Sequence, residues 1–115
     1  MSIASKLNKG NSPFSVKTEG FQFTNLRDLY EGNGADVKYT LLGVYVNNKG
    51  RFGAEPMAIV DGYKVNLPKH LLDEVQMILD DDEMIQAIID GKLGFQVEPY
   101  TNSRGTFYSV HWIDL

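Results

Sequence analysis

Cationic and aromatic side chains are interleaved in two short polar segments of this chain. The two sets are Lys49, Arg51 and Phe52, and Tyr100, Arg104 and Phe107. Cations neutralise backbone phosphates, and exposed aromatic rings provide faces on which unpaired bases stack. The combination predicts binding to single-stranded nucleic acid without sequence preference. The alternative is that these rings belong to the hydrophobic core and that the cations only keep the surface soluble.

The residues that could support catalysis or hold a metal lack the spacing that such sites need. The acidic run from Asp80 to Glu83 has Ile85 at its sixth position, where an EF-hand loop needs glycine, and it suits a helix start instead. His70 and His111 are the only histidines, and neither a cysteine nor an H-E-x-x-H pattern accompanies them. The sequence therefore predicts a binding protein without cofactor or metal, and not an enzyme.

The net charge of −4 is unevenly distributed along the chain. Residues 69–91 hold seven acidic side chains and one lysine, a net charge of −6, and the other residues sum to +2. A basic face opposite an acidic helix is therefore compatible with the negative total. The same segment supports an alternative function, a protein-binding module or phage-encoded inhibitor whose acidic helix, within residues 69–90, covers a basic partner surface.

The length and composition predict one small domain. Residues 1–12 are small and polar with Lys6 and Lys9, which predicts a flexible basic arm, and residues 13–115 are expected to form a single domain with one core. The chain has no cysteine, no apolar leader and no apolar run long enough to cross a bilayer. We therefore expect a cytoplasmic protein that does not enter a membrane.

Residue periodicity predicts a mainly β domain with one helical segment. Five strands are expected, over residues 14–26, 37–47, 57–67, 93–100 and 106–113. Asp61-Gly62 interrupts the third range, where we favour one bent strand over a tight hairpin. Residues 26–36 predict a long loop with one helical turn. The apolar spacing after Pro68 predicts a helix that breaks near Asp80 and ends at Gly91.

A glycine lies inside the strongest strand pattern of the chain, VKYTLLGVYVN. Gly43 costs stability there unless the strand bulges or bends. We therefore expect a bend at Gly43. The side chains expected to face inward on its two sides are Val37, Tyr39, Leu41, Val44 and Val46.

The order of three strands, a helix and two strands is that of the OB-fold, a five-stranded barrel. Residues 14–114 resemble this fold through that order, through Gly43 and through the long first loop, which makes residues 13–115 an OB-fold-like domain. Three stretches are also similar to small single-stranded DNA-binding proteins encoded by phages and mobile elements of Gram-positive bacteria. These stretches are GVYVNNKGRFG, DGYKVNLPKHL and RGTFYSVHWIDL.

The resemblance implies both a function and a site. It implies a non-catalytic single-stranded DNA-binding protein that serves phage or plasmid DNA replication or recombination. OB-folds bind nucleic acid on the face of strands two and three and with the first and last loops. The residues that this implies here are Lys38, Tyr45, Lys49, Arg51, Phe52, Tyr63, Lys64, Tyr100, Arg104 and Phe107. RNA as the ligand and a homodimer as the oligomeric state stay open.

Overall fold

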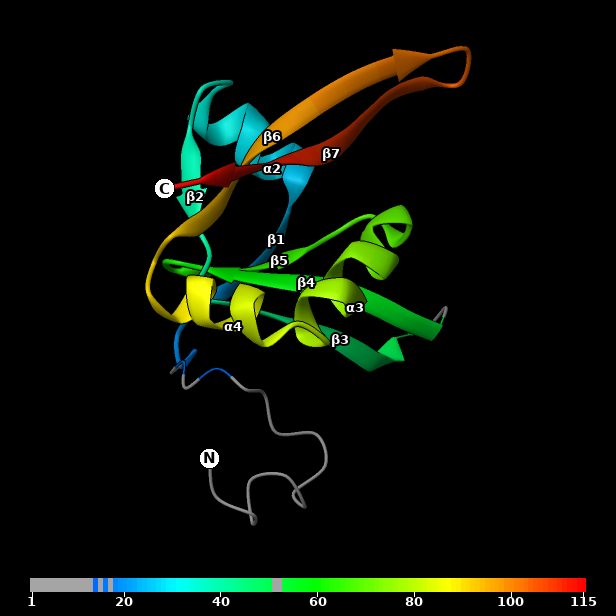
Figure 1. Cartoon of the computed structure of the whole chain (residues 1–115). Coiled ribbons are helices and arrows are strands. Elements are labelled where there is room, and N and C mark those ends of the chain that lie inside the picture. Colours follow the sequence, from blue (N-terminus) through cyan, green and yellow to red (C-terminus); the bar gives the residue numbers. More distant parts are fainter. Residues whose placement is uncertain (1–13, 15, 17, 51–52) are drawn as a thin grey trace.

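The computed structural model describes residues 14, 16, 18–50 and 53–115, with the backbone alone for residues 48–50 (Figure 1). The predicted arm, residues 1–12, lies outside the described residues. Within the described ranges, no helix has the length and the apolar character needed to span a bilayer.

Two β-sheets and three α-helices form the described part of the chain. The four-stranded sheet has the order β1 (Gln22–Asn25), β5 (Tyr63–Asn66), β4 (Gly53–Val60) and β3 (Gly43–Gly50). The three-stranded sheet has the order β2 (Lys38–Thr40), β6 (Leu93–Asn102) and β7 (Gly105–Asp114). The helices are α2 (Leu26–Asn33), α3 (Leu72–Leu79) and α4 (Asp82–Ile89), with a 3₁₀ turn η1 (Lys69–Leu71) before α3. Figure 1 shows the β6–β7 hairpin (orange and red) above the four-stranded sheet, in which β1 is blue and β3, β4 and β5 are green.

One hydrophobic core joins the two sheets and the helices. The sheets contribute Val44, Ala58, Val65, Phe95, Val97 and Val110, and the helices contribute Leu26, Leu29, Val75, Ile78 and Ile88. Burying each such side chain of valine size or larger stabilises the fold by about 1.5–3 kcal/mol. The core therefore holds the three-stranded sheet and the helices on one face of the four-stranded sheet.

The predicted second strand, residues 37–47, passes from one sheet to the other in its middle. β2 pairs with β6, and β3 pairs with β4. The N–H of Leu41 donates to the carbonyl oxygen of Leu93 at 3.0 Å, and the N–H of the next residue, Leu42, donates to that of Ile59 at 2.8 Å. The predicted bend is thus confirmed, directly before Gly43. A Cβ on that glycine would lie 3.1 Å from the Phe14 side chain, so close packing also favours glycine there.

The helical segment and the closing hairpin are confirmed. α3 ends before Asp80, and α4 starts after Asp81, whose carboxylate accepts from the N–H groups of Glu83 and Met84 at 2.9 and 3.1 Å. α4 ends before Gly91, which has φ +71°. β6 and β7 pair in one continuous antiparallel register. Both elements follow from local signals, a helix cap and a strand alternation.

Two predictions about the middle strands and the first loop are wrong. Residues 57–67 form a tight hairpin and not one bent strand, because Asp61-Gly62 makes a two-residue turn with φ +83° at the glycine. The predicted loop of residues 26–36 contains the helix α2. This helix forms because the Asn25 side chain caps it by accepting from the N–H of Asp28 at 2.8 Å.

The first strand and the closed barrel also differ from the prediction. Among the described residues of the range 14–26, only the four of β1 form a strand. The five-stranded barrel is not formed, since the seven strands in the described residues divide into two sheets that do not close. The reason lies in β5, which is bonded to β4 on one side and to β1 on the other, and so has no edge left for the second sheet.

Gly94 of β6 provides a test of the close contact between β6 and β2 in the three-stranded sheet. A Cβ there would press on the main-chain carbonyl oxygen of Tyr39 and lie 2.9 Å from Cδ1 of Leu115. We expect Gly94→Ala to lower the free energy of unfolding by about 1–3 kcal/mol, the usual cost of overpacking. Urea unfolding followed by the fluorescence of Trp112 measures this change.

The matched control is Gly32→Ala in α2, where nothing lies within 4 Å of the added Cβ. This substitution should raise the free energy of unfolding by about 0.4–1 kcal/mol, since alanine restricts the unfolded chain and favours helix. Equal stability of the two variants would contradict the described contact between β2 and β6.

Candidate nucleic-acid interface

Two exposed aromatic rings stack at the outer end of the β6–β7 hairpin. Tyr100 and Phe107 are opposite each other in the register, with ring centroids 5.7 Å apart and an angle of 27° between the ring planes. Tyr100 is 42% exposed and Phe107 is 38% exposed. Each ring supports the other, so the pair presents a preorganised aromatic surface to solvent.

His70 joins this pair to the start of the helical segment. Its Nε2 atom lies 3.0 Å from Oγ of Ser109, and its ring meets that of Tyr100 edge-on, with centroids 6.4 Å apart. η1 holds His70 in place through the bond from the Leu71 N–H to the carbonyl oxygen of Pro68 at 2.9 Å. The histidine therefore connects the hairpin to the turn that precedes α3.

The aromatic pair borders a cleft of about 430 Å³ between the hairpin, the start of α2 and the chain after β5. Its lining includes Arg27, Asn66, His70 and both stacked rings, and no acidic residue is among the described residues that form it. The side chain of Arg27 donates a hydrogen bond to Glu31 at 3.2 Å, which raises the pKa of the guanidinium. The cleft is therefore mainly apolar, with one guanidinium, that of Arg27, at its border, and this guanidinium forms an exposed ion pair with Glu31.

A second aromatic group lies beside the cleft, on β1 and β5. Phe23 is 65% exposed, and Nζ of Lys64 lies 4.6 Å from the centroid of its ring. Phe23 pairs with Lys64 in the parallel register of β1 and β5. Two residues further along these strands, Asn25 pairs with Asn66, and both asparagines line the cleft. Two residues of a parallel strand span about 6.6 Å. The cation–π pair therefore lies on strands that end at the cleft, and it faces the side of the sheet opposite the core residue Val65.

The structure brings together only some of the residues predicted from the sequence. Tyr100 and Phe107 stack, and Arg104 lies next to them in the hairpin turn, where its N–H donates to Oδ1 of Asn102 at 2.8 Å. Lys64 lies along the strand that leads to the cleft. These residues form the candidate interface.

Three other predicted residues lie elsewhere. Tyr63 and Lys64 are neighbours in β5, so their side chains point to opposite faces of the sheet. Lys38 belongs to β2, at the edge of the other sheet. Tyr45, on β3, is half-buried, and burial raises the pKa of its phenol, which keeps the ring uncharged.

The sheet face between Tyr45 and Lys64 is not open. Met57 and Ile59 of β4 lie between them in the register, and both side chains are buried. The structure therefore does not present one exposed binding face across the strands that carry Tyr45 and Lys64. The side chains of the last three predicted residues, Lys49, Arg51 and Phe52, lie outside what the structure describes.

Sequence reasoning missed Phe23 and His70. The strand expected over residues 14–26 includes Phe23, but no strand partner was predicted for it, and the parallel pairing with β5 places Phe23 beside Lys64 at the surface. His70, considered from the sequence only as a metal ligand, lies in η1 before α3. Its contact with Ser109 spans 39 positions of sequence, and no local pattern reports such a contact.

Comparisons of the chain with protein-family models, with curated proteins and with solved structures give no match. In the described residues, no group of three or more histidine or acidic side chains is arranged to hold a metal ion. The functional assignment therefore depends on the cleft and its rings.

The stacked pair should be detectable as an energetic coupling. We expect Tyr100→Ala and Phe107→Ala each to lower the free energy of unfolding. The double variant should lose about 0.5–1.5 kcal/mol less than the sum of the single losses, the value of an aromatic contact. Urea unfolding of the four proteins measures the coupling.

The control pairs Phe107→Ala with Tyr63→Ala, since Tyr63 lies on a strand of the other sheet. Those two losses should add to within about 0.3–0.5 kcal/mol. Strict additivity of the Tyr100 and Phe107 losses would mean that the rings are not in contact in solution.

Proposed function

We propose that this protein binds single-stranded DNA with little sequence preference, and that the bases stack on the Tyr100–Phe107 pair. The main support for the proposal is this stacked pair, which is exposed at the border of the cleft. No acidic residue is among the described residues that line the cleft. A flat ring accepts every base, because each base has a π face. Stacking on such a surface therefore gives affinity without reading the sequence.

Cations around the pair supply the attraction for phosphates. Arg104 lies in the turn beyond the rings, Arg27 lines the cleft, and Lys64 lies on the strand leading to it. A single-stranded oligonucleotide that passes from the hairpin turn into the cleft comes close to Arg104 and Arg27, and it reaches Lys64 where it continues around the edge strand β1 to the opposite face of the sheet. Duplex DNA should bind more weakly, since paired and stacked bases do not offer their faces to the rings.

The strand connections support an open variant of the OB-fold as the scaffold. Residues 38–50 act as one bent first strand shared by both sheets, β4 and β5 follow as a hairpin, α3 and α4 come next, and β6 and β7 close the order. With this assignment Arg104 lies in the loop between the last two strands, which OB-folds use for oligonucleotides. β1 and α2 then precede the OB-like part. A cytoplasmic role in phage or plasmid DNA replication or recombination is the setting we propose for this activity.

Binding to a fluorescent oligonucleotide of about 30 nucleotides, measured by anisotropy at several salt concentrations, tests the proposal. Tyr100→Ala and Phe107→Ala should each weaken binding by about 1–3 kcal/mol, the value of one stacking platform, and leave the salt dependence unchanged. Arg104→Gln and Lys64→Gln should each reduce the log–log salt slope by about 0.7, since each removes one phosphate contact.

Tyr63→Ala and Lys38→Gln are the matched controls, because they change the same residue types away from the cleft. Both should retain the affinity and the salt slope of the unmodified protein. The proposal is wrong if the protein does not bind the single strand at low micromolar concentration in about 50 mM salt, where phosphate contacts are weakly screened. It is also wrong if duplex binds as tightly.

A further inference from the structure

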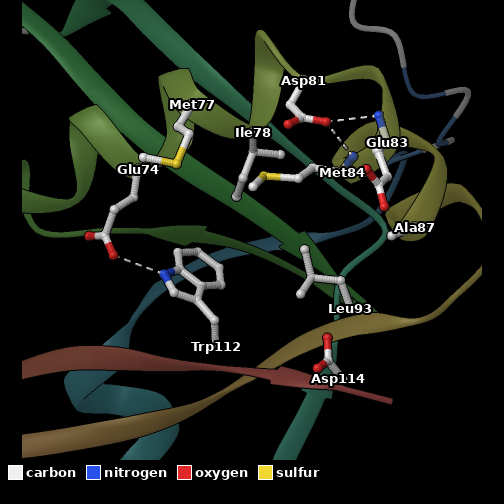
Figure 2. A pocket seen from close by; sticks show the side chains of 10 residues that line it. All are labelled: Glu74, Met77, Ile78, Asp81, Glu83, Met84, Ala87, Leu93, Trp112 and Asp114. Atoms are coloured by element: carbon white, nitrogen blue, oxygen red, sulfur yellow. Dashed lines mark hydrogen bonds between the residues drawn. The ribbon is translucent and has the colours of Figure 1, made fainter.

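A second, acidic groove lies between α3, α4 and the end of the β6–β7 hairpin that is away from its turn. It has a volume of about 480 Å³. Figure 2 shows its apolar side chains, with Met77 and Ile78 from α3, Met84 from α4, and Leu93 and Trp112 from the hairpin strands. Met77 is 57% exposed, so the apolar surface of the groove is open to solvent.

Acidic side chains surround this apolar surface. The carboxylates are those of Glu74, Asp81, Glu83 and Asp114, and no cationic residue is among the described residues that line the groove. Two of the four already have partners. Glu74 accepts from the indole N–H of Trp112 at 3.1 Å, and Asp81 caps α4 (Figure 2).

The other two carboxylates are available to a ligand. The side chains of Glu83 and Asp114 make no hydrogen bond and no ion pair within the described part of the chain. They lie at the same groove as Met77, so a ligand that covers the methionine comes close to both charges. The groove is therefore complementary to a ligand with an apolar stripe and cationic groups beside it.

We propose that this groove is a docking site for a basic amphipathic helix of a partner protein. The apolar stripe of such a helix covers Met77, Met84 and Trp112, and its lysines or arginines approach Glu83 and Asp114. Methionine side chains adapt to different apolar partners, and methionine and tryptophan are enriched in the centres of protein interfaces. A helix in an apolar groove is a common mode of peptide recognition.

The charge of the groove distinguishes this occupant from nucleic acid. Four carboxylates repel phosphates, whereas the cleft near Tyr100 has no acidic residue in its described lining. The two hollows use opposite ends of β7, with Trp112 and Asp114 in the groove and Phe107 and Tyr108 in the cleft. The docking site therefore does not depend on the proposed DNA binding and is tested without DNA.

Trp112 makes the experiment direct, because it is the only tryptophan of the chain and it lines the groove. The probe is a synthetic peptide of leucine and lysine, about 15 residues long so that it can form a helix, with leucines at helical spacing. Its control has glutamate in place of every lysine. Titration of the full chain with the lysine peptide should change the Trp112 emission to saturation, and the glutamate peptide should cause no change.

Two pairs of variants locate the binding. Glu83→Gln with Asp114→Asn should weaken the lysine peptide about fivefold or more, the effect of two exposed ion pairs. Asp73→Asn with Asp82→Asn removes the same charge from the same part of the molecule, outside the groove, and should have little effect. Met77→Ser should weaken binding about tenfold through lost apolar contact, and Ile89→Ser, at a site 55% exposed outside the groove, should not.

Several results would overturn the proposal. Equal losses in each variant and its control would mean that the peptide binds by general charge attraction. Saturable binding of the glutamate peptide would exclude a site for basic helices. A change of Trp112 emission on dilution of the free protein would identify a second copy as the occupant. A change caused by Lys6→Gln with Lys9→Gln in the free protein would identify the chain's own basic segment instead.

Discussion

The passage of one strand between the two sheets is the constraint on which the rest of the structure depends. Leu41 and Leu42 are consecutive, yet their N–H groups donate to Leu93 and to Ile59, which belong to different sheets. Leu41 is fully buried, so this transition lies inside the core. Because two consecutive main-chain N–H groups are hydrogen-bonded to different sheets, the sheets have little freedom to move apart at this point. The position of the β6–β7 hairpin relative to β4 and β5 follows from it.

The β6–β7 hairpin contributes residues to both the cleft and the acidic groove. Its outer end meets His70 and the start of α2 and forms the cleft, whereas Trp112 at its inner end meets Glu74 on α3 and forms the groove. Polar bonds hold the hairpin at each place, from His70 to Ser109 and from Trp112 to Glu74. The half-buried indole N–H of Trp112 needs such a partner, so its bond to Glu74 helps to select the orientation of the hairpin, whereas the contact between His70 and Ser109 is exposed to solvent.

Local signals in the sequence account for the parts of the fold that local interactions determine. The helix break before Asp81 follows from its side-chain cap, and the closing hairpin follows from strand alternation, which also placed Tyr100 and Phe107 in one turn region. The parallel pairing of β1 with β5 joins segments some forty residues apart, and it decides that Phe23 is exposed and that the barrel stays open. Periodicity describes one segment and does not identify its partner, so these features could not be predicted.

The distance along β7 between the acidic groove and the cleft bears on the proposal that a chain of net charge −4 binds phosphates. Tyr108 of the cleft and Trp112 of the groove are four residues apart on an antiparallel strand, about 14 Å. The Debye length is about 8 Å at physiological ionic strength and about 30 Å at 0.01 M. The field of the acidic groove is therefore mostly screened at the cleft under physiological conditions, and it reaches the cleft only at very low salt. Lowering the salt then strengthens the phosphate contacts and the repulsion together, so the salt dependence of DNA binding should flatten in that range.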